Sequence, residues 1–286
     1  MNAEIMTLKQ CLEKIPKRDP FGHKGTFGKV LLLCGSRGFT GAAYFAAMGA
    51  LRSGTGLVYL GVPESIYEIE AVKLREPVIF PLPDQGGMLS REAIAEILHK
   101  LPRMDAVLIG CGLGKSQGTR QVTEAVLEAA ACPVILDADG INVMAAHKDI
   151  LRRRAAPTIL TPHDGEFLRI GGELREDRMD SAAQLSRQLN AIVLLKGHET
   201  CITDGNRGYL NKTGNSGMAK GGSGDVLAGM ILGLLGQGME PLEAAACGAL
   251  LHGAAGDLCR EELTEYGMLP SDLLSALPRL MKQGGM

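Results

Sequence analysis

The chain has 286 residues, of which 45% are apolar, so it can bury a sizeable core and is not intrinsically disordered. Its 30 basic and 32 acidic residues leave a formal net charge of −2, which provides no basic surface for nucleic acid or an anionic membrane. We therefore expect small-molecule partners, with no nucleic acid and no membrane.

The N-terminal segment and the cysteines indicate the compartment. The N-terminus has charges scattered through it and lacks the apolar core of a secretory signal. The longest apolar stretch, residues 226–235, is too short to span a bilayer. The 7 cysteines are widely spaced and never paired as CxxC, which argues against a disulfide framework or a zinc site and is typical of small core residues. We expect a cytoplasmic protein.

Short β-branched or leucine-rich runs alternate with stretches of helical period, as a parallel sheet with crossover helices requires. The predicted strands are residues 30–33, 57–61, 78–80, 106–109, 134–137, 158–160 and 192–196. The predicted helices between them include residues 41–52, 90–100, 119–130 and 181–189. The pattern predicts an α/β fold built from βαβ units.

The alternation of predicted strands and helices ends at Thr200. Residues 200–203 and 207–210 flank an Asp-Gly-Asn turn and are predicted to form a β-hairpin. A glycine-rich loop over residues 214–224 follows. Three helices then complete the chain, at about residues 225–235, 242–257 and 271–281. No Pro/Ser linker or internal repeat interrupts the pattern, so we expect a single domain over residues 1–286.

Several familiar motifs are incomplete. Residues 110–116 resemble a Walker A loop, but Ile109 stands where the first glycine is required, and Lys115 interrupts the GxGxxG alternative. Asp225 replaces the last glycine of GxSxG, and Ile202 replaces the second histidine of HExxH. A glycine-rich turn after a strand remains at residues 110–116, where α/β sheets bind ligands, although a plain tight turn explains it equally well.

The glycine-rich loop that ends in Gly221-Gly-Ser-Gly-Asp225 is the most informative segment. Free backbone N–H groups and the positive end of a helix dipole would meet there, forming an anion site suited to a phosphoryl group in transfer. Asp225, in the first helical turn, can accept a proton from an attacking hydroxyl, as an Asp base does in kinases. The alternative is that Asp225 only caps the helix and the glycines form a hinge.

Two segments that follow strands favour the phosphoryl-transfer interpretation. His163 can donate a hydrogen bond to substrate and Glu166 can hold a metal-bound water or phosphate, although both residue types are common as caps. Lys196 can contact a nucleotide phosphate and Gly197 permits close approach of a base or ribose, although a surface Lys often follows a strand. Together they indicate nucleotide-dependent phosphoryl chemistry.

Six motifs occur in order along the chain: KGTFGK from Lys24, GSRGFTGAA from Gly35, DAD from Asp137, TPHDGE from Thr161, KGHET from Lys196 and GGSGD from Gly221. This set resembles the ADP-dependent NAD(P)H-hydrate dehydratases of the ribokinase-like superfamily. The resemblance implies a three-layer α/β/α ribokinase-like fold with a mainly parallel central sheet and a C-terminal β-hairpin. Gly140 and Ser223 depart from the usual pattern, where Ala and Thr are common.

The resemblance implies a lyase that repairs NAD and NADP cofactors. The enzyme would phosphorylate the hydroxyl of the S-epimer of hydrated NADH or NADPH, termed NADHX and NADPHX, and eliminate phosphate to restore NADH or NADPH. ADP, or ATP, would be the donor, with ADP giving AMP. Mg²⁺ is expected from phosphoryl chemistry, with Glu166 as a candidate ligand through water.

The resemblance also assigns residues to roles. Asp225 becomes the base on the hydrate hydroxyl, and the N–H groups of Gly222, Ser223 and Gly224 stabilise the transferred phosphoryl group. The residues placed against the hydrated dinucleotide, besides Asp225, are Ala43, Gly112 and His163. Those placed against the nucleotide are Lys196, Gly197, His198, Glu199, Thr200 and Gly224.

Assembly and partner proteins follow only by analogy. Relatives are often tetramers, so a homotetramer is expected, and the apolar helices over residues 225–257 can serve as a subunit contact or as core. Some relatives carry an epimerase domain before this one, whereas here residues 1–23 form only an N-terminal extension. We expect no epimerase domain in this chain and a separate epimerase.

Two other functions remain open at this point. One is a small-molecule kinase of the same superfamily, of the hydroxymethyl-thiazole or pyrimidine type, which would release the phosphorylated product. The small residues Ala43 and Gly112 favour a dinucleotide over such a substrate. The other is a nucleotide-binding regulator without catalysis, against which the intact loop and Asp225 argue.

Overall fold

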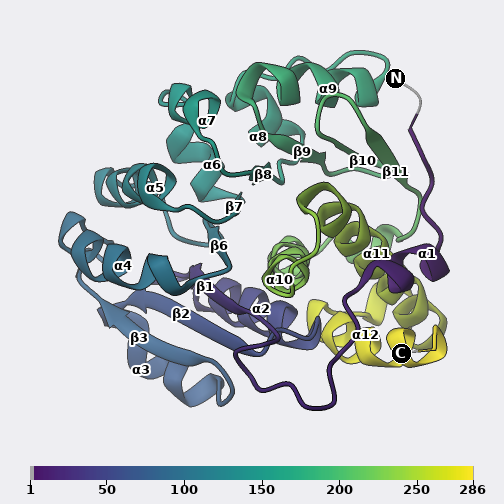
Figure 1. The fold of residues 1–286 in the computed structure, drawn as a ribbon, viewed down its shortest axis with the longest axis horizontal. Coiled ribbons are helices and arrows are strands. Elements are labelled where there is room, and N and C mark those ends of the chain that lie inside the picture. The colour runs from purple at the N-terminus through teal and green to yellow at the C-terminus, as the bar shows by residue number, and fades with distance from the viewer. Residues whose placement is uncertain (1–2, 286) are drawn as a thin grey trace.

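The computed structural model describes residues 3–285 and has three layers, with helices on both faces of one twisted sheet (Figure 1). The strands of the sheet are β1 (Lys29–Leu33), β2 (Leu57–Pro63), β3 (Val78–Leu82), β6 (Ala106–Ile109), β7 (Val134–Leu136), β8 (Thr158–Leu160), β9 (Ile192–Leu195), β10 (Thr200–Thr203) and β11 (Gly208–Asn211). A small separate hairpin pairs β4 (Asp84–Gln85) with β5 (Met88–Leu89).

The main sheet has the order β11-β10-β9-β8-β7-β6-β1-β2-β3. Neighbours from β3 to β9 pair in parallel, whereas β10 and β11 continue the sheet as an antiparallel hairpin. The predicted parallel sheet with a C-terminal hairpin is therefore confirmed. The chain runs outward from β1 to β3 and returns to β6 on the other side of β1. That reversal creates the kind of crevice in which α/β sheets bind ligands.

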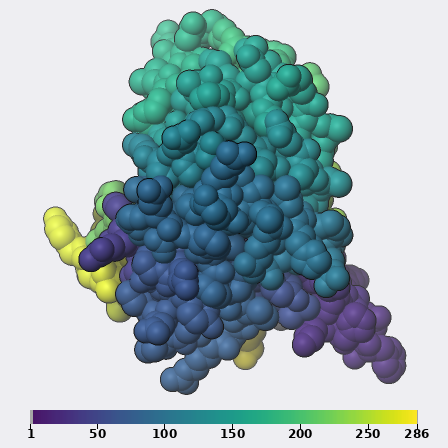
Figure 2. Space-filling view, turned by 90° about the vertical axis from the view of Figure 1, so that its left-hand side faces the viewer, coloured from purple at the N-terminus to yellow at the C-terminus, as the bar shows by residue number. Residues whose placement is uncertain are grey.

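Two helical layers cover the sheet. One contains α1 (Leu8–Lys14), α2 (Thr40–Arg52), α3 (Glu64–Lys73), α10 (Ser223–Gly236), α11 (Pro241–Gly267) and α12 (Pro270–Gln283). The other contains α4 (Ile94–Lys100), α5 (Gln117–Ala129), α6 (Asp139–Met144), α7 (Asp149–Arg153), α8 (Asp164–Arg169) and α9 (Arg178–Leu189). The short 3₁₀ helices are η1 (Arg91–Ala93), η2 (Leu101–Arg103) and η3 (Ser216–Met218). Figure 2 shows the side that carries α4 and α5 as a continuous surface, coloured blue to teal.

Several predicted boundaries were wrong by a few residues, for identifiable reasons. The segment 90–100 begins as the 3₁₀ turn η1 and becomes helical only at Ile94. The helix predicted over 242–257 continues to Gly267, with a kink at Thr264, whose φ is 66°. The strands β7 and β9 end one residue early, so Asp137 and Lys196 lie just beyond them. Because these two polar residues lie outside the strands, their side chains are not constrained to point to one face of the sheet.

Close packing between α2 and α10 fixes the position of α10. A Cβ at Gly233 would lie 2.6 Å from the carbonyl oxygen of Ala50, and a Cβ at Gly229 would lie closer still to that of Ala46. Only glycine lets the two backbones approach so closely. The helix is buried along almost its whole length. Its N-terminus is thereby held at the edge of the sheet where the parallel strands end.

The cysteines lie mainly in the core. The seven cysteines are free thiols, and all but Cys132 are buried, as small core residues are. Among the described residues, none of the helices is both long and apolar enough to cross a membrane.

Candidate active site

A cavity of about 1040 Å³ opens where the strands end. We call one side of it the strand wall, formed by residues that follow β7, β8 and β9: Asp137, His163, Glu166 and Lys196. We call the other side the helix wall, formed by residues 221–225 and by His252 of α11. The loop over residues 213–220 closes the cavity between them. Segments far apart in the sequence thus face one another across one space.

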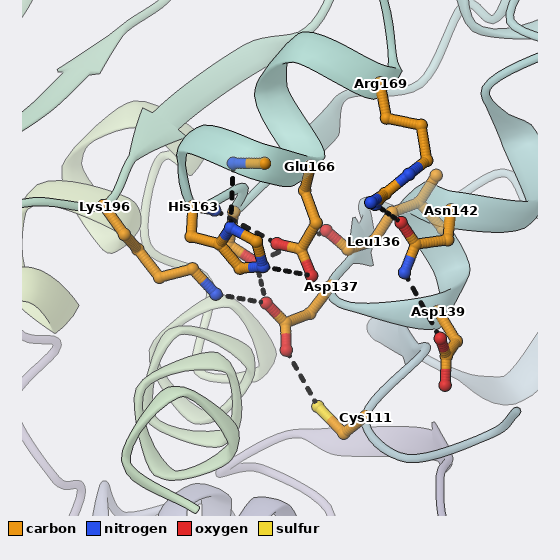
Figure 3. Close-up of polar contacts among 11 residues, drawn as sticks. Cys111, Leu136, Asp137, Asp139, Asn142, His163, Glu166, Arg169 and Lys196 are labelled. Atoms are coloured by element: carbon orange, nitrogen blue, oxygen red, sulfur yellow. Dashed lines mark hydrogen bonds and ion pairs between the residues drawn. The ribbon is translucent and has the colours of Figure 1, made fainter. Parts of the chain in front are cut away.

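Asp137 is the centre of the strand wall. Its Oδ1 accepts hydrogen bonds from the Thr161 hydroxyl at 2.6 Å and from Lys196 Nζ at 2.8 Å, and its Oδ2 accepts one from the Cys111 thiol at 3.4 Å. The lysine, the thiol and the carboxylate turn toward one another in Figure 3. The Asp137 side chain is only 3% exposed. It is a buried, fully hydrogen-bonded charge rather than a mobile one.

Lys196 carries a positive charge next to the start of α10. Burial disfavours its ammonium, but the carboxylates of Asp137 and Glu166 outweigh that effect and raise the pKa of Lys196 above its ordinary value. A Cβ at Gly224 would lie 3.5 Å from Lys196 Nζ, so the ammonium faces the first turn of the helix. The cation and the helix N-terminus both favour an anion between them.

His163 and Glu166 both cap α8 and face the cavity. The Gly165 N–H donates to His163 Nδ1 at 3.0 Å, so the neutral ring carries its proton on Nε2. The His163 N–H donates to Glu166 Oε2 at 3.0 Å, and His163 Nε2 lies 3.4 Å from Glu166 Oε1. The imidazole remains 60% exposed. The ring is therefore accessible from the cavity, but a ligand would have to share its Nε2 with Glu166.

The start of α10 needs glycine for steric reasons. Gly222 is the N-cap residue with φ of 101°, and a Cβ there would lie 2.7 Å from the ring of Phe45. Ser223 and Gly224 open the first turn, where an α-helix provides no acceptors of its own for the N–H groups. The Ser223 N–H donates to the Lys220 carbonyl at 3.2 Å, so the first turn presents the Gly224 N–H rather than that of Ser223 to the cavity. The alternative that Asp225 is the N-cap is wrong, because that position belongs to Gly222.

Asp225 lies in the first turn beside Asp137 and Cys111. One ligand atom from each of the three side chains lies within 4.8 Å of the other two. Burial and the Asp137 charge raise the pKa of Asp225 to about 7, while Cys111 and Lys196 act in the opposite direction. A carboxylate whose pKa is close to neutral is suited to accept and return a proton.

The structure separates the predicted residues into two groups. Most line the cavity: His163, Glu166, Lys196, Gly197, His198, Thr200, Gly222, Ser223, Gly224 and Asp225. Glu199 points elsewhere and pairs with Lys212 at 3.3 Å. Ala43 has no exposed surface, and Gly112 packs against Phe39 and Ala42 between the ends of β1 and β6. The roles of all these residues stay predictions, including those of Ala43, Gly112 and Glu199.

Sequence reasoning missed two contributors to the site. Cys111 was interpreted only as a small core residue, yet its thiol touches the carboxylate cluster. His252 received no role, although it is buried and lines the cavity. The signal that could have found His252 is a histidine within residues 244–256, which otherwise consist of Ala, Gly, Leu and Cys.

The sequence of the chain is similar to those of known NAD(P)H-hydrate dehydratases. The profile of a carbohydrate-kinase-like family, described as NAD(P)H-hydrate dehydratase, matches residues 30–279. The chain is 41% identical over 288 residues to the bifunctional NAD(P)H-hydrate repair enzyme Nnr of Moorella thermoacetica, covering 98% of this chain and 54% of the relative. It is 37% identical over 289 residues to the ADP-dependent (S)-NAD(P)H-hydrate dehydratase of Bacillus subtilis, covering 99% of each. It thus spans about half the length of the bifunctional enzyme.

Solved structures agree with the predicted fold. The Bacillus subtilis ADP/ATP-dependent NAD(P)H-hydrate dehydratase, co-crystallised with ATP and Mg²⁺, matches with a TM-score of 0.86 at 34% identity over 99% of both chains. A ribokinase-like superfamily protein of Enterococcus faecalis matches with a TM-score of 0.86 at 27% identity, covering 99% of this chain and 96% of that one. The three-layer ribokinase-like fold is confirmed.

Proposed function

Because the chain belongs to the NAD(P)H-hydrate dehydratase family, we propose that it is an ADP-dependent (S)-NAD(P)H-hydrate dehydratase, a carbon–oxygen lyase of metabolite repair. Its substrates are the S-epimers of NADHX and NADPHX, and its products are NADH and NADPH. ADP provides the phosphoryl group and leaves as AMP, with ATP as the other candidate donor. The relative of equal length from Bacillus subtilis supports this choice.

The position of Asp225 carries the proposal. Its carboxylate, with a pKa of about 7, lies in the first turn of α10 beside the Lys196 ammonium and the backbone donors of the glycine-rich loop. A proton acceptor and an anion site therefore share one end of a buried helix. Phosphorylation of a hydroxyl needs both groups at the same place.

The chemistry follows from that arrangement. The hydroxyl oxygen of the hydrate attacks the β-phosphorus of ADP while Asp225 accepts the hydroxyl proton. The bond between that phosphorus and the leaving AMP breaks. We assign the N–H groups of Gly222, Ser223 and Gly224 to the phosphoryl group in transfer. The Ser223 N–H donates to the Lys220 carbonyl in the structure and would have to leave it to reach the phosphoryl group. Phosphate is a far better leaving group than hydroxide, so the ring nitrogen of the phosphorylated hydrate expels it. Loss of a proton from the neighbouring ring carbon restores the double bond of NADH or NADPH.

The strand wall fits the magnesium ion that nucleotide chemistry requires. Mg²⁺ in proteins is usually held by one or two carboxylates, several waters and the phosphates of the substrate. The Glu166 carboxylate lines the cavity and can hold the ion through water. Bound there, the ion would neutralise charge on the nucleotide phosphates.

The remaining contacts divide between the two substrates. We assign Ala43, Gly112 and His163 to the hydrated dinucleotide. The nucleotide is assigned to Lys196, Gly197, His198, Glu199, Thr200 and Gly224. The exposed imidazole of His163 and the Lys196 charge support the polar part of this division. A bound dinucleotide would have to open the packing around the fully buried Ala43.

We further infer one ribokinase-like domain over residues 1–286, assembled as a cytoplasmic homotetramer and working beside a separate epimerase. The core already uses α10 and most of α11, so contacts between copies must involve other faces. Light scattering on the purified chain measures the assembly directly. A monomeric mass would contradict the tetramer without touching the proposed activity.

The test is incubation of the purified protein with NADH hydrate, Mg²⁺ and either ADP or ATP, following the return of reduced-nicotinamide absorbance. Recovery that requires nucleotide is the expected result, and the faster of the two nucleotides identifies the donor. Absence of recovery with a substrate proven competent on a known dehydratase would contradict the proposal. A phosphorylated thiazole or pyrimidine alcohol in a parallel assay would then identify a small-molecule kinase.

A further inference from the structure

His252 makes a contact that the catalytic scheme does not yet use. It lies in α11, and its Nε2 is 3.2 Å from the Ser223 hydroxyl oxygen in the first turn of α10. Both residues line the cavity, yet His252 is only 8% exposed and Ser223 only 7%. A buried histidine is therefore hydrogen-bonded to the residue that begins the phosphate-facing helix.

The backbone around His252 is rigid. A Cβ at the next residue, Gly253, would lie 2.6 Å from the carbonyl oxygen of Thr213, and one at Gly248 would lie 2.5 Å from Ile231 of α10. The Thr213 hydroxyl in turn donates to the Leu250 carbonyl at 3.1 Å. The imidazole is thus carried on a segment packed tightly against both α10 and the loop that closes the cavity.

The imidazole is neutral under physiological conditions. Burial lowers the pKa of His252 to about 4; a hydrogen bond with the Ser223 backbone opposes this effect, whereas the charge of Lys196 adds to it. A neutral imidazole has one N–H donor and one acceptor nitrogen. The Ser223 hydroxyl has one proton, so the tautomer of His252 decides whether that proton points toward the ring or away from it.

We propose that His252 is a positioning residue that donates its Nε2 proton to the Ser223 oxygen and thereby turns the single Ser223 hydroxyl proton toward the phosphoryl group. Ser223 then acts as a catalytic donor through its side-chain hydroxyl. An anion in the cavity, beside Lys196 and the helix N-terminus, stabilises this orientation over the reverse one. The proposal rests on the phosphoryl-transfer function described above.

The kinetic test is a double-mutant cycle in the hydrate-dehydration assay. We expect Ser223→Ala and His252→Ala each to lower kcat by about 10- to 100-fold with little change in KM, because one donor to the transferring group is lost. In the Ser223→Ala background, His252→Ala should cost little more, since it acts through the missing hydroxyl. His252→Gln, which retains an N–H donor, should recover part of the rate.

Controls separate positioning from folding. His147→Gln removes a surface histidine that pairs with Glu124 away from the cavity and should leave kcat unchanged. Thermal unfolding of each variant shows whether the fold persists. Equal losses from His252→Ala in the wild-type and Ser223→Ala backgrounds would overturn the proposal and leave His252 with a purely structural role.

A second measurement does not depend on turnover. Nitrogen NMR of the imidazole should report a neutral ring protonated on Nε2 between about pH 5.5 and 8, both with and without ADP and Mg²⁺. A ring protonated on Nδ1 in the nucleotide complex would overturn the inferred donor. If the wild-type protein proved inactive on NADH hydrate, the proposed function would fail, while this spectrum would still decide how His252 and Ser223 are bonded.

Discussion

The two walls of the cavity are built by different means. On the strand wall, Asp137 is held by Lys196, Thr161 and Cys111, so side-chain hydrogen bonds and charges define its geometry. On the helix wall, the start of α10 is placed by the left-handed Gly222 and by glycine packing against α2. One wall is an electrostatic network and the other is a packed backbone.

The difference shows how each wall can fail. Charges on the strand wall depend on protonation, so they can be altered by pH or by removing one partner. The backbone packing that places the helix wall does not depend on protonation, but it tolerates no added atoms where two backbones meet. Asp225 belongs to both walls, because it lies on the helix while its pKa is raised by burial and by the charge of Asp137 across the cavity. Substitutions on the two sides should therefore have different signatures.

The largest effect is expected where the two walls meet. Asp225→Asn keeps the shape of the side chain but cannot accept a proton, so kcat should fall by roughly 10²–10⁴-fold. Steady-state dehydration of NADH hydrate with ADP measures the loss. Asp149→Asn, on the exposed surface of α7, is the matched control. Turnover that survives Asp225→Asn would remove Asp225 from the role of base.

Gly229→Ala should disturb the packing of α10 on α2 without altering the charges of the strand wall. The added methyl would collide with the backbone of Ala46 in α2, so the free energy of unfolding should fall by about 2 kcal/mol or more. Chemical denaturation measures the change. Gly41→Ala, where the new Cβ meets only the Phe45 ring at 3.8 Å, should cost nothing. Equal stability of both variants would show that the close approach of α2 and α10 does not fix the helix.

The sequence predicts the positions of the strand-wall residues better than those of the helix-wall residues. Hydrophobic runs predicted the strands, and the ends of parallel strands necessarily share one edge of the sheet, which brings Lys196 to His163. The GGSGD segment predicted the start of α10 because glycine and a first-turn Asp are local signals. These features depend on short stretches of chain.

What the sequence did not reveal depends on contacts between distant segments. The approach of Cys111 to Asp225 requires both the register of β6 beside β7 and the depth at which α10 packs on α2. The bond between His252 and Ser223 depends on how α11 crosses α10. The burial of Ala43 is likewise a tertiary property. No local pattern encodes these distances.

Lys196→Met should change the pH dependence of activity, which depends on the charges of the strand wall. Asp225 acts as a base only when ionised, so activity should rise as the pH increases through about 7, with a roughly tenfold loss per pH unit below it. The Lys196 charge lowers the pKa of Asp225, so its removal should move this limb to higher pH. Lys9→Met, a surface change, should leave the limb in place. An unshifted profile would mean that Lys196 does not influence the base.

The smallest expected effect is a change in the free energy of unfolding. Asp225→Asn should stabilise the fold although it lowers activity. The pKa of Asp225 is raised from the ordinary 3.8 to about 7 in the folded state, so between these values the unfolded chain ionises first and stability falls as pH rises. Above pH 7 that cost is complete. Asp225→Asn removes it and should increase the free energy of unfolding at pH 8 by about 1 kcal/mol, allowing for solvent screening.

Near pH 4, where the folded Asp225 is protonated and only part of the unfolded population is ionised, the same substitution should give almost no gain. Urea denaturation of the wild type and of Asp225→Asn at the two pH values measures the difference. A gain that is the same at both pH values would arise from altered packing and not from the buried charge. A gain confined to pH 8 would mean that the carboxylate is destabilising in its ionised form, which is the cost of holding a base next to Asp137 in a site of low exposure.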